Sequence, residues 1–170
     1  MKNTKILIID DDIDTINIYK AILEKENYQV FNASNKNEGI KIANEQLPDL
    51  IVLDVMMTTH YEGFELKQEL DKNIKLNTIP VIFQTSIDLL TTSDAQKESI
   101  QEMARAFRND PKYKELQVLL IKNLTNGLNG VDYLNEDGKN VYFEVDGFLR
   151  KPVKGDELLA EIRRLIKKVA

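Results

Sequence analysis

The sequence predicts an α/β protein with a doubly wound parallel sheet, and two observations lead to this fold class. Apolar runs of four or five residues recur along the chain without alternating polar positions. Such runs are typical of strands that are buried on both faces. Segments with helical spacing of apolar residues separate these runs, and strands that alternate with helices form βαβ units whose helices cover both faces of a parallel sheet.

The composition indicates a soluble domain. The chain has 170 residues, 42% of them hydrophobic and 30% charged, with a formal net charge of −5. This length is ample to bury a core, and the negative charge disfavours a broad nucleic-acid surface. The absence of cysteine from the sequence excludes disulfides, thiol catalysis and zinc–thiolate or iron–sulfur sites. No apolar stretch matches a membrane span or a signal peptide, so we expect a cytoplasmic protein.

The first strand and helix are predicted at the start of the chain. A buried strand at Lys5–Ile9 ends abruptly in three aspartates. Apolar residues at helical spacing follow up to about Asn27, and either Asp12 or Asp14 is suited to cap this helix. A second strand is expected at Tyr28–Ala33.

The next three elements repeat this order. Asn35 and the residues after it have the spacing of a capping box, and Pro48 ends the helix that follows. Asp49–Asp54 is a third buried strand, which again ends in an acid. A short helix is predicted from Gly63 to about Lys72.

Two further strands and a helix complete the predicted sheet. Ile79–Thr85 is the fourth strand, with a proline near its start, where a missing N–H is tolerated. Gly147–Arg150 is the fifth strand and precedes Lys151 and Pro152. The final helix carries an apolar stripe formed by Leu158, Ile162, Leu165, Ile166 and Val169.

The connection between the fourth and fifth strands is much longer than the roughly twenty to twenty-five residues that one crossover helix with its loops requires. We therefore expect a single domain, residues 1–170, with an insertion at about residues 88–145. The insertion is predicted to contain a helix, an additional strand and a β-hairpin, at Asp94–Arg108, Val118–Ile121, and Val131–Leu134 with Val141–Val145. Its aromatic residues are expected to form a small core, with an exposed partner-binding patch as the alternative.

Polar and charged residues end the predicted strands. Asp10 and Asp11 follow the first strand, Asp54 ends the third, Thr85 ends the fourth and Lys151 follows the fifth. The carboxyl ends of parallel strands meet at one edge of an open sheet. Carboxylates packed together repel one another unless a hard divalent cation joins them, and few protein ligands with several waters suit Mg²⁺. The sequence therefore predicts a magnesium-dependent phosphoryl-transfer site.

The residue types in this site suggest a role for each side chain. Asp54 is suited to be the attacking nucleophile. Lys151 and the metal would neutralise the phosphoryl oxygens, and Thr85 would hydrogen-bond one of them.

Four segments resemble the motifs of the response-regulator receiver domain of two-component signalling. They are the run ending in Asp10-Asp11-Asp12, Asp49–Asp54, Ile79–Thr85 and Phe148–Pro152. The four occur in order at strand ends, which makes the resemblance specific, and it covers residues 4 to about 86 and 146 to 169. The resemblance implies a flavodoxin-like five-stranded sheet with strand order 2-1-3-4-5.

The resemblance also implies the chemistry of the site. Asp54 would accept a phosphoryl group from a phosphohistidine on a sensor histidine kinase or a phosphotransfer protein. Mg²⁺ would be held by Asp10, Asp11, Asp54 and the backbone carbonyl of Met56. The loop after Asp54 departs from the family pattern, because it has no proline before Gly63.

The resemblance further identifies the residues that respond to phosphorylation. Thr85 and Phe148 stand at the positions of the family's switch pair, where a hydroxyl and an aromatic ring reorient together. Lys151 matches the lysine that contacts the phosphoryl group, and its bond to Pro152 is usually cis in the family.

The expected function is a phosphoacceptor switch, which is not an enzyme beyond slow loss of its own phosphoryl group. No DNA-binding segment follows Ala170 in this sequence, so direct binding to DNA or membranes is not expected. Output would come through protein contacts, onward phosphotransfer or dimerisation, and we favour protein contacts that involve the insertion.

Two alternatives remain open at the level of the sequence. The altered loop after Asp54 leaves room for a receiver-like interaction module that is never phosphorylated. Asp10 and Asp12 also match the Asp-x-Asp spacing of aspartate-nucleophile phosphohydrolases of the haloacid-dehalogenase type. That motif, however, expects Thr or Val where this chain has Asp14.

Overall fold

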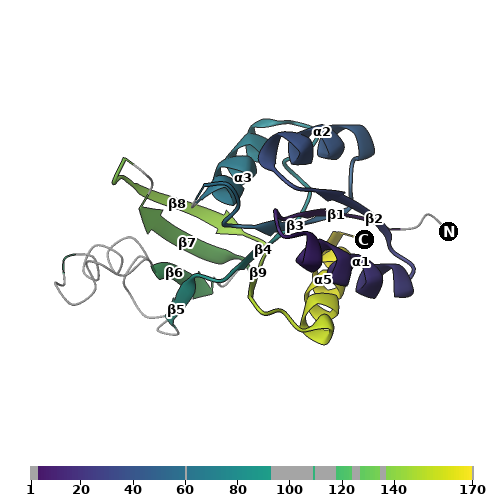
Figure 1. The fold of residues 1–170 in the computed structure, drawn as a ribbon. Helices are drawn as coiled ribbons and strands as arrows, with labels where there is room; N and C mark the ends of the chain where they lie inside the picture. The colour runs from purple at the N-terminus through teal and green to yellow at the C-terminus, as the bar shows by residue number, and fades with distance from the viewer. Residues whose placement is uncertain are drawn as a thin grey trace. The chain divides into compact units, whose positions relative to one another are not determined.

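The computed structural model describes residues 4–59, 61–92, 109, 118–123, 127–134 and 137–169 (Figure 1). The chain divides into two compact units. Residues 1–85 and 147–170 form the first unit, and residues 86–146 form the second.

The first unit contains a five-stranded parallel sheet with the order β2-β1-β3-β4-β9 (Figure 1). Its strands, in chain order, are β1 (Lys5–Ile9), β2 (Gln29–Ala33), β3 (Leu50–Asp54), β4 (Val81–Thr85) and β9 (Gly147–Arg150). Since β9 is the fifth strand of this sheet, the predicted flavodoxin-like order is confirmed.

Among the helices that the structure describes, α2 and α3 lie on one side of this sheet, and α1 and α5 on the other (Figure 1). Their bounds are α1 (Ile13–Lys25), α2 (Lys36–Gln46), α3 (Glu62–Lys72) and α5 (Gly155–Val169). Asp12, rather than Asp14, caps α1, since its side chain accepts a hydrogen bond from the Asp14 N–H at 3.1 Å. Within the described ranges, no helix has both the length and the apolar character that a membrane span requires.

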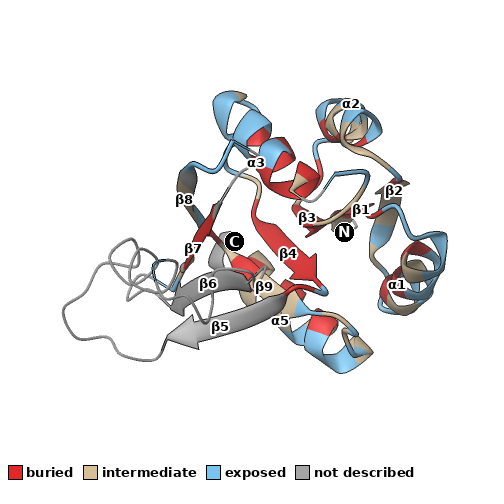
Figure 2. Cartoon of the chain, turned by 60° about the vertical axis from the view of Figure 1, so that its left-hand side comes forward, coloured by how far each residue is buried: buried red, intermediate tan, exposed pale blue. Residues whose placement is uncertain are grey.

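One hydrophobic core of the first unit lies between the sheet and the helices α1 and α5. Every residue of β3 and β4 is buried, as expected for strands covered on both faces (Figure 2). The buried residues of this core are Ile6, Ile8, Ile16, Tyr19, Leu23, Leu50, Val52, Ile82, Leu158, Ile162 and Leu165. Three of them belong to the apolar stripe predicted for the last helix.

The opposite face of the sheet packs closely against α2 and α3. A Cβ atom on Gly39 of α2 would lie 2.8 Å from Ile9 Cδ1, so a larger residue there would require the Ile9 side chain to shift. On α3, the ring of Phe64 meets Phe83 of β4 edge to face, with centroids 5.1 Å apart. These contacts fix both helices relative to the strands that carry the predicted site.

The second unit has a sheet of its own, with the order β5-β6-β7-β8. Its strands are β5 (Asp88–Thr92), β6 (Val118–Asn123), β7 (Asn129–Leu134) and β8 (Asn140–Val145). The predicted hairpin is present as the antiparallel pair β7–β8, and the predicted additional strand is β6. Sequence analysis missed β5, which pairs in parallel with β6. Only two of its five residues are strongly apolar, so the segment lacks the apolar run by which β1, β3 and β4 were found.

Part of the predicted insertion lies outside the described residues, including the helix expected at Asp94–Arg108. In the described part of the insertion, Tyr133 is buried, and its ring meets Phe143 edge to face at a centroid distance of 6.0 Å. Val131 and Val145 are buried in the same unit. These residues agree with a small core within the second unit.

Candidate functional site

The residues predicted to form the site lie at the carboxyl ends of neighbouring strands. Asp10 and Asp11 directly follow β1, and Asp54 is the last residue of β3, which pairs with β1. Thr85 is the last residue of β4, and Lys151 directly follows β9. The order of the sheet therefore places all five residues at one edge of the first unit.

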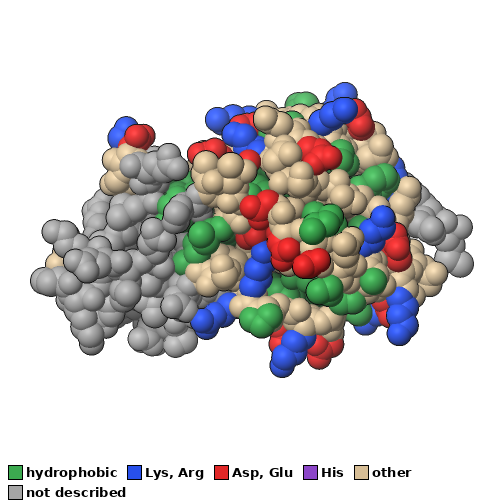
Figure 3. Space-filling view, viewed as in Figure 1, with side chains coloured by type: hydrophobic (Ala, Val, Ile, Leu, Met, Phe, Trp, Pro, Cys, Tyr) green, Lys and Arg blue, Asp and Glu red, His purple; other side chains and the backbone are tan. Residues whose placement is uncertain are grey.

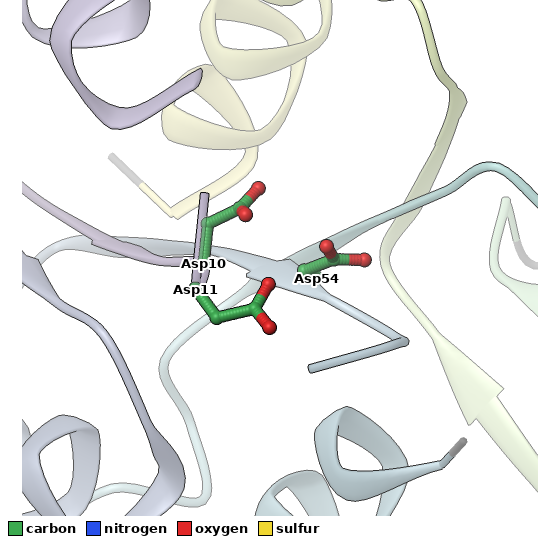
Figure 4. A group of neighbouring side chains, drawn as sticks. All are labelled: Asp10, Asp11 and Asp54. Atoms are coloured by element: carbon green, nitrogen blue, oxygen red, sulfur yellow. The ribbon is translucent and has the colours of Figure 1, made fainter. Parts of the chain in front are cut away.

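Three carboxylates meet at this edge. One oxygen from each of Asp10, Asp11 and Asp54 lies within 4.8 Å of the others (Figure 4). Asp10 is fully buried and Asp54 is 4% exposed, whereas Asp11 is exposed to solvent. In the space-filling view, acidic side chains lie beside basic side chains near the middle of the face (Figure 3). The cluster thus combines two desolvated carboxylates with one that solvent reaches.

Lys151 connects the two buried carboxylates. Its ammonium nitrogen lies 2.9 Å from Asp10 Oδ2 and 2.5 Å from Asp54 Oδ2. Its backbone N–H donates to the Thr85 carbonyl at 2.8 Å, which anchors the residue to the end of β4. The Lys151–Pro152 peptide bond is cis, as the family resemblance implies.

Burial dominates the electrostatics of the cluster. Desolvation raises the pKa of Asp54 to about 6, against the opposing effects of the hydrogen bond and charge of Lys151. Burial likewise raises the pKa of Asp10 above its ordinary value. Removing these carboxylates from water disfavours their charged forms, whereas a nearby cation favours the charged forms. The cluster is therefore suited to bind more positive charge than Lys151 supplies.

The loop after Asp54 is held by α3 and α2. Asp54 Oδ1 accepts a hydrogen bond from the Met56 N–H at 3.1 Å. A Cβ atom on Gly63 would lie 2.0 Å from the backbone oxygen of Asp54, so only glycine fits where α3 passes this residue. Glu62, at the start of α3, is buried and accepts from the N–H groups of Thr58 at 2.9 Å and Lys36 at 3.1 Å. Glu62 thus ties the loop that lacks the usual proline to the first turn of α2.

A family model described as the response regulator receiver domain matches residues 6–110, more than half of the chain. The chain belongs to the response regulator receiver domain family. Because the match ends within residues 86–146, β9 and Lys151 lie beyond it. Their place in the receiver domain follows instead from the pairing of β9 with β4 and from the ion pairs of Lys151.

Two relatives match this receiver domain over most of their own length. Protein PilH of Pseudomonas aeruginosa is 30% identical over 114 residues, which cover 65% of this chain and 88% of PilH. Sporulation initiation phosphotransferase F of Bacillus subtilis is 31% identical over 115 residues, with the same two shares. In contrast, the match to the alkaline phosphatase synthesis transcriptional regulatory protein PhoP of Bacillus subtilis, 35% identical over 86 residues, covers 51% of this chain but only 35% of PhoP.

Solved structures share the fold. The signal receiver domain of a signal transduction histidine kinase from Syntrophus aciditrophicus aligns with a TM-score of 0.59 and 25% identity, over 98% of this chain and 92% of that one. A CheY-like response regulator receiver domain protein from Methanospirillum hungatei aligns with a TM-score of 0.60 and 20% identity, over 98% and 96%.

Thr85 and Phe148, the predicted switch pair of this receiver domain, lie on adjacent strands. Thr85 is fully buried at the end of β4. Phe148 is half-buried in β9, and its ring centroid lies 6.1 Å from that of Phe83. Phe83 pairs with Phe148 in the register of β4 and β9. The Phe148 ring therefore packs against Phe83, which lies two residues before Thr85 on β4.

Sequence analysis missed two residues that contact this site. Gln84 is fully buried, and its Nε2 donates to Asp10 Oδ2 at 2.7 Å. The Tyr19 hydroxyl donates to Gln84 Oε1 at 2.6 Å. The signal available in the sequence was the glutamine itself, which interrupts the apolar run of β4 one residue before its end.

Proposed function

We propose that this receiver domain is a magnesium-dependent phosphoacceptor in a phosphorelay, which receives a phosphoryl group on Asp54 from a sensor histidine kinase or a phosphotransfer protein. One observation carries the proposal: the Lys151 ammonium group bridges Asp54 and Asp10 within a cluster of three carboxylates. An acceptor carboxylate, further acids and a fixed cation are the groups that phosphoryl transfer to aspartate requires.

The donor set fits Mg²⁺. The carboxylates of Asp10, Asp11 and Asp54 are hard oxygen ligands whose oxygens lie close enough to share one ion, and the exposed Asp11 leaves room for water ligands. The Met56 carbonyl, two residues after Asp54, is the fourth protein ligand in the proposal. The bound ion would supply positive charge that neutralises the phosphoryl oxygens during transfer.

The chain's own residues carry out the remaining steps. An Asp54 carboxylate oxygen attacks the phosphorus atom, the P–N bond of the phosphohistidine breaks, and the imidazole leaves with the bonding electron pair. Lys151 then pairs with a phosphoryl oxygen, and the Thr85 hydroxyl donates to another. Since only ionised Asp54 attacks, and burial raises its pKa to about 6 in the absence of a cation, the bound ion would also favour acceptance by favouring the ionised form of Asp54.

Thr85 and Phe148 are proposed to convert phosphorylation of Asp54 into a change in the surface that a partner contacts. Movement of the Thr85 hydroxyl toward the phosphoryl group would vacate space at the end of β4, and the Phe148 ring would turn inward. The partner would be a protein, contacted through a surface that includes residues 86–146. This is a population shift driven by a local change of charge.

The contacts of Asp12 favour this function over the phosphohydrolase alternative. That alternative needs Asp12 as a second acid in the active site. In this protein the Asp12 carboxylate accepts hydrogen bonds from the Asp14 N–H at 3.1 Å and the Thr15 hydroxyl at 2.6 Å. A carboxylate engaged in capping α1 is already committed to a structural role.

The test is intact-mass measurement after incubation with acetyl phosphate, with and without Mg²⁺, beside an Asp54→Asn control. We expect a Mg²⁺-dependent gain of one phosphoryl group in the wild-type protein and none in the variant. The same gain in Asp54→Asn would show that another residue accepts the phosphoryl group. No gain from acetyl phosphate or from a phosphorylated histidine phosphotransfer protein would leave the receiver-like interaction module as the better description.

A further inference from the structure

A buried polar chain runs from α1 to the acid cluster and is not used by the proposed function. The Tyr19 hydroxyl donates to Gln84 Oε1 at 2.6 Å, and Gln84 Nε2 donates to Asp10 Oδ2 at 2.7 Å. All three residues are at least 96% buried. Burying an amide and a hydroxyl is unfavourable unless each is hydrogen-bonded, whereas an apolar side chain would fill the same space without that penalty.

The direction of the hydrogen bonds follows from the groups involved. An ionised carboxylate only accepts, so the NH₂ group of Gln84 must face Asp10. The amide oxygen then faces Tyr19, and the phenol must donate to it. Asp10 therefore fixes which end of the Gln84 amide points toward the acid cluster, and the Tyr19 hydroxyl supplies the matching donor for the amide oxygen.

The backbone of Gln84 is also hydrogen-bonded to the chain directly after the second buried acid, Asp54. Its carbonyl accepts a hydrogen bond from the N–H of Val55, the residue after Asp54, at 2.9 Å. Its side chain points to the α1 and α5 side of the sheet, where Ile82, two residues earlier on β4, packs in the same core as Tyr19. One residue thus joins the ends of β1 and β3 through its side chain and its backbone.

The carboxylate of Asp10 is held at both oxygens. Oδ1 accepts from the Asp12 N–H at 2.9 Å, and Oδ2 accepts from Gln84 at 2.7 Å and Lys151 at 2.9 Å. In the proposed function Lys151 turns to the phosphoryl group, so Gln84 would then remain as the side-chain donor on Oδ2. Ligand carboxylates that are hydrogen-bonded from behind keep their orientation toward a metal.

We propose that Gln84, held in place by its hydrogen bond from Tyr19, is a positioning residue that holds Asp10 in the orientation required to bind a divalent cation. This inference rests on the proposed function. Neither residue touches the phosphoryl group or the ion, and both act through Asp10. Loss of either should therefore weaken cation binding while leaving the acceptor chemistry of Asp54 intact once the ion is bound.

The experiment compares Gln84→Met and Tyr19→Phe with the matched control Tyr28→Phe, which removes the same atom from a tyrosine packed against the same core. Mg²⁺ affinity is measured by isothermal titration calorimetry. We expect the Mg²⁺ dissociation constant to rise about tenfold in Gln84→Met, the lower end of the range typical for loss of such a supporting partner. The rise in Tyr19→Phe should be smaller, about severalfold, because Tyr19 acts on Asp10 only through Gln84. The control should keep the wild-type affinity.

A second readout separates positioning from general loss of structure. The rate of phosphoryl gain from acetyl phosphate is followed as a function of Mg²⁺ concentration. A positioning role shifts the half-saturating Mg²⁺ concentration upward and leaves the rate at saturating Mg²⁺ near that of the wild type. A merely structural role lowers the saturating rate without moving the half-saturation point, and that result would overturn the inference.

The outcomes distinguish this inference from the proposed function. If the wild-type protein binds Mg²⁺ and both variants bind it equally well, the positioning role of Gln84 is wrong while the proposed function stands. If the wild-type protein binds no Mg²⁺, both are wrong. Should Gln84→Met fail to fold, Tyr19→Phe decides the question, since it removes one hydroxyl only, and unchanged Mg²⁺ affinity in it overturns the inference.

Discussion

The Asp54 carboxyl lies in surroundings that oppose its charge. It is 4% exposed, close to Asp10, and Lys151 is the cation that pairs with both. Desolvation raises its pKa from the ordinary value of 3.8 to about 6. Between these pH values the folded protein holds the Asp54 proton more tightly than the unfolded chain does. The stability of the folded state therefore falls as the pH rises through this interval, and the full penalty applies above it.

We expect Asp54→Asn to stabilise the protein at pH 7.5 in the absence of divalent cations. A shift of about two pKa units corresponds to about 3 kcal/mol, and loss of the Lys151 hydrogen bond offsets part of it. The expected increase in the free energy of unfolding is thus about 1–2 kcal/mol at pH 7.5, and close to zero at pH 4. Urea denaturation at both pH values measures it, with Asp137→Asn at an exposed position as the control. An equal increase at pH 4 and pH 7.5 would contradict the assignment to the Asp54 charge.

Glu62 gives a second prediction at the scale of a residue. Its two carboxylate oxygens accept from the backbone N–H groups of Thr58 and Lys36. Glu62→Gln replaces one acceptor with an NH₂ group that faces an N–H donor, so we expect a loss of about 1–3 kcal/mol in the free energy of unfolding. Urea denaturation measures it.

The matched control for Glu62 is Glu65→Gln on the same helix. Glu65 is exposed and pairs with Lys36 Nζ at 3.4 Å, so its loss should change stability by no more than about 0.5 kcal/mol. Equal effects of the two substitutions would show that the buried contacts of Glu62 do not hold the loop.

At the scale of an element, the N-terminus of α1 separates a structural acid from the acids of the site. Asp10 and Asp11 take part in the carboxylate cluster, whereas the third aspartate of the run, Asp12, caps the helix. A run of identical residues thus contains two distinct roles. The turn between β1 and α1 directs successive side chains to different neighbours.

We expect Asp12→Ala to lower the melting temperature by about 2–4 °C, the effect of losing one helix cap in a protein of this size. Asp12→Asn, which retains a capping oxygen, should melt close to the wild-type temperature. Both variants should still gain a phosphoryl group on Asp54, and intact mass measures that gain. Loss of the gain in both variants, with folding retained, would give Asp12 a role in the chemistry.

At the scale of the whole molecule, the residues of the proposed site all belong to the first unit. Asp10, Asp11, Asp54, Thr85 and Lys151 lie within residues 1–85 and 147–170. Residues 86–146 connect β4 to β9, two parallel neighbours in one sheet. A parallel pair needs a connection of about a dozen residues or more, because the chain must return along the length of the strand.

We expect a protein in which residues 86–146 are replaced by a glycine–serine linker of about fifteen residues to accept a phosphoryl group with Mg²⁺, because the linker is long enough for the crossover. Intact mass after incubation with acetyl phosphate measures this, with Asp54→Asn in the same shortened chain as the control. Loss of acceptance in a shortened protein that still unfolds cooperatively would place part of the required structure in residues 86–146.

The sequence predicted most of the elements that carry the site. Apolar runs without alternation identified β1, β3 and β4, since strands covered on both faces need apolar residues at every position. Asp54 was found because it stands where such a run ends, and Lys151 because it directly follows the predicted fifth strand. The run that begins at Asp88 contains two leucines among polar residues, so β5 escaped detection, and its pairing with β6 depends on residues some thirty positions away.

Residue types and strand order by themselves determined the fold class and the set of candidate acids. Apolar periodicity is a local property of the chain. Once the strands are predicted to be parallel, the residues after their carboxyl ends are expected at one edge of the sheet. Only the tertiary structure decided which side chains touch. The bridge from Lys151 to Asp10 and Asp54 and the chain from Tyr19 through Gln84 to Asp10 join residues up to 141 positions apart. Such contacts are set by packing in three dimensions, and spacing along the sequence does not encode them.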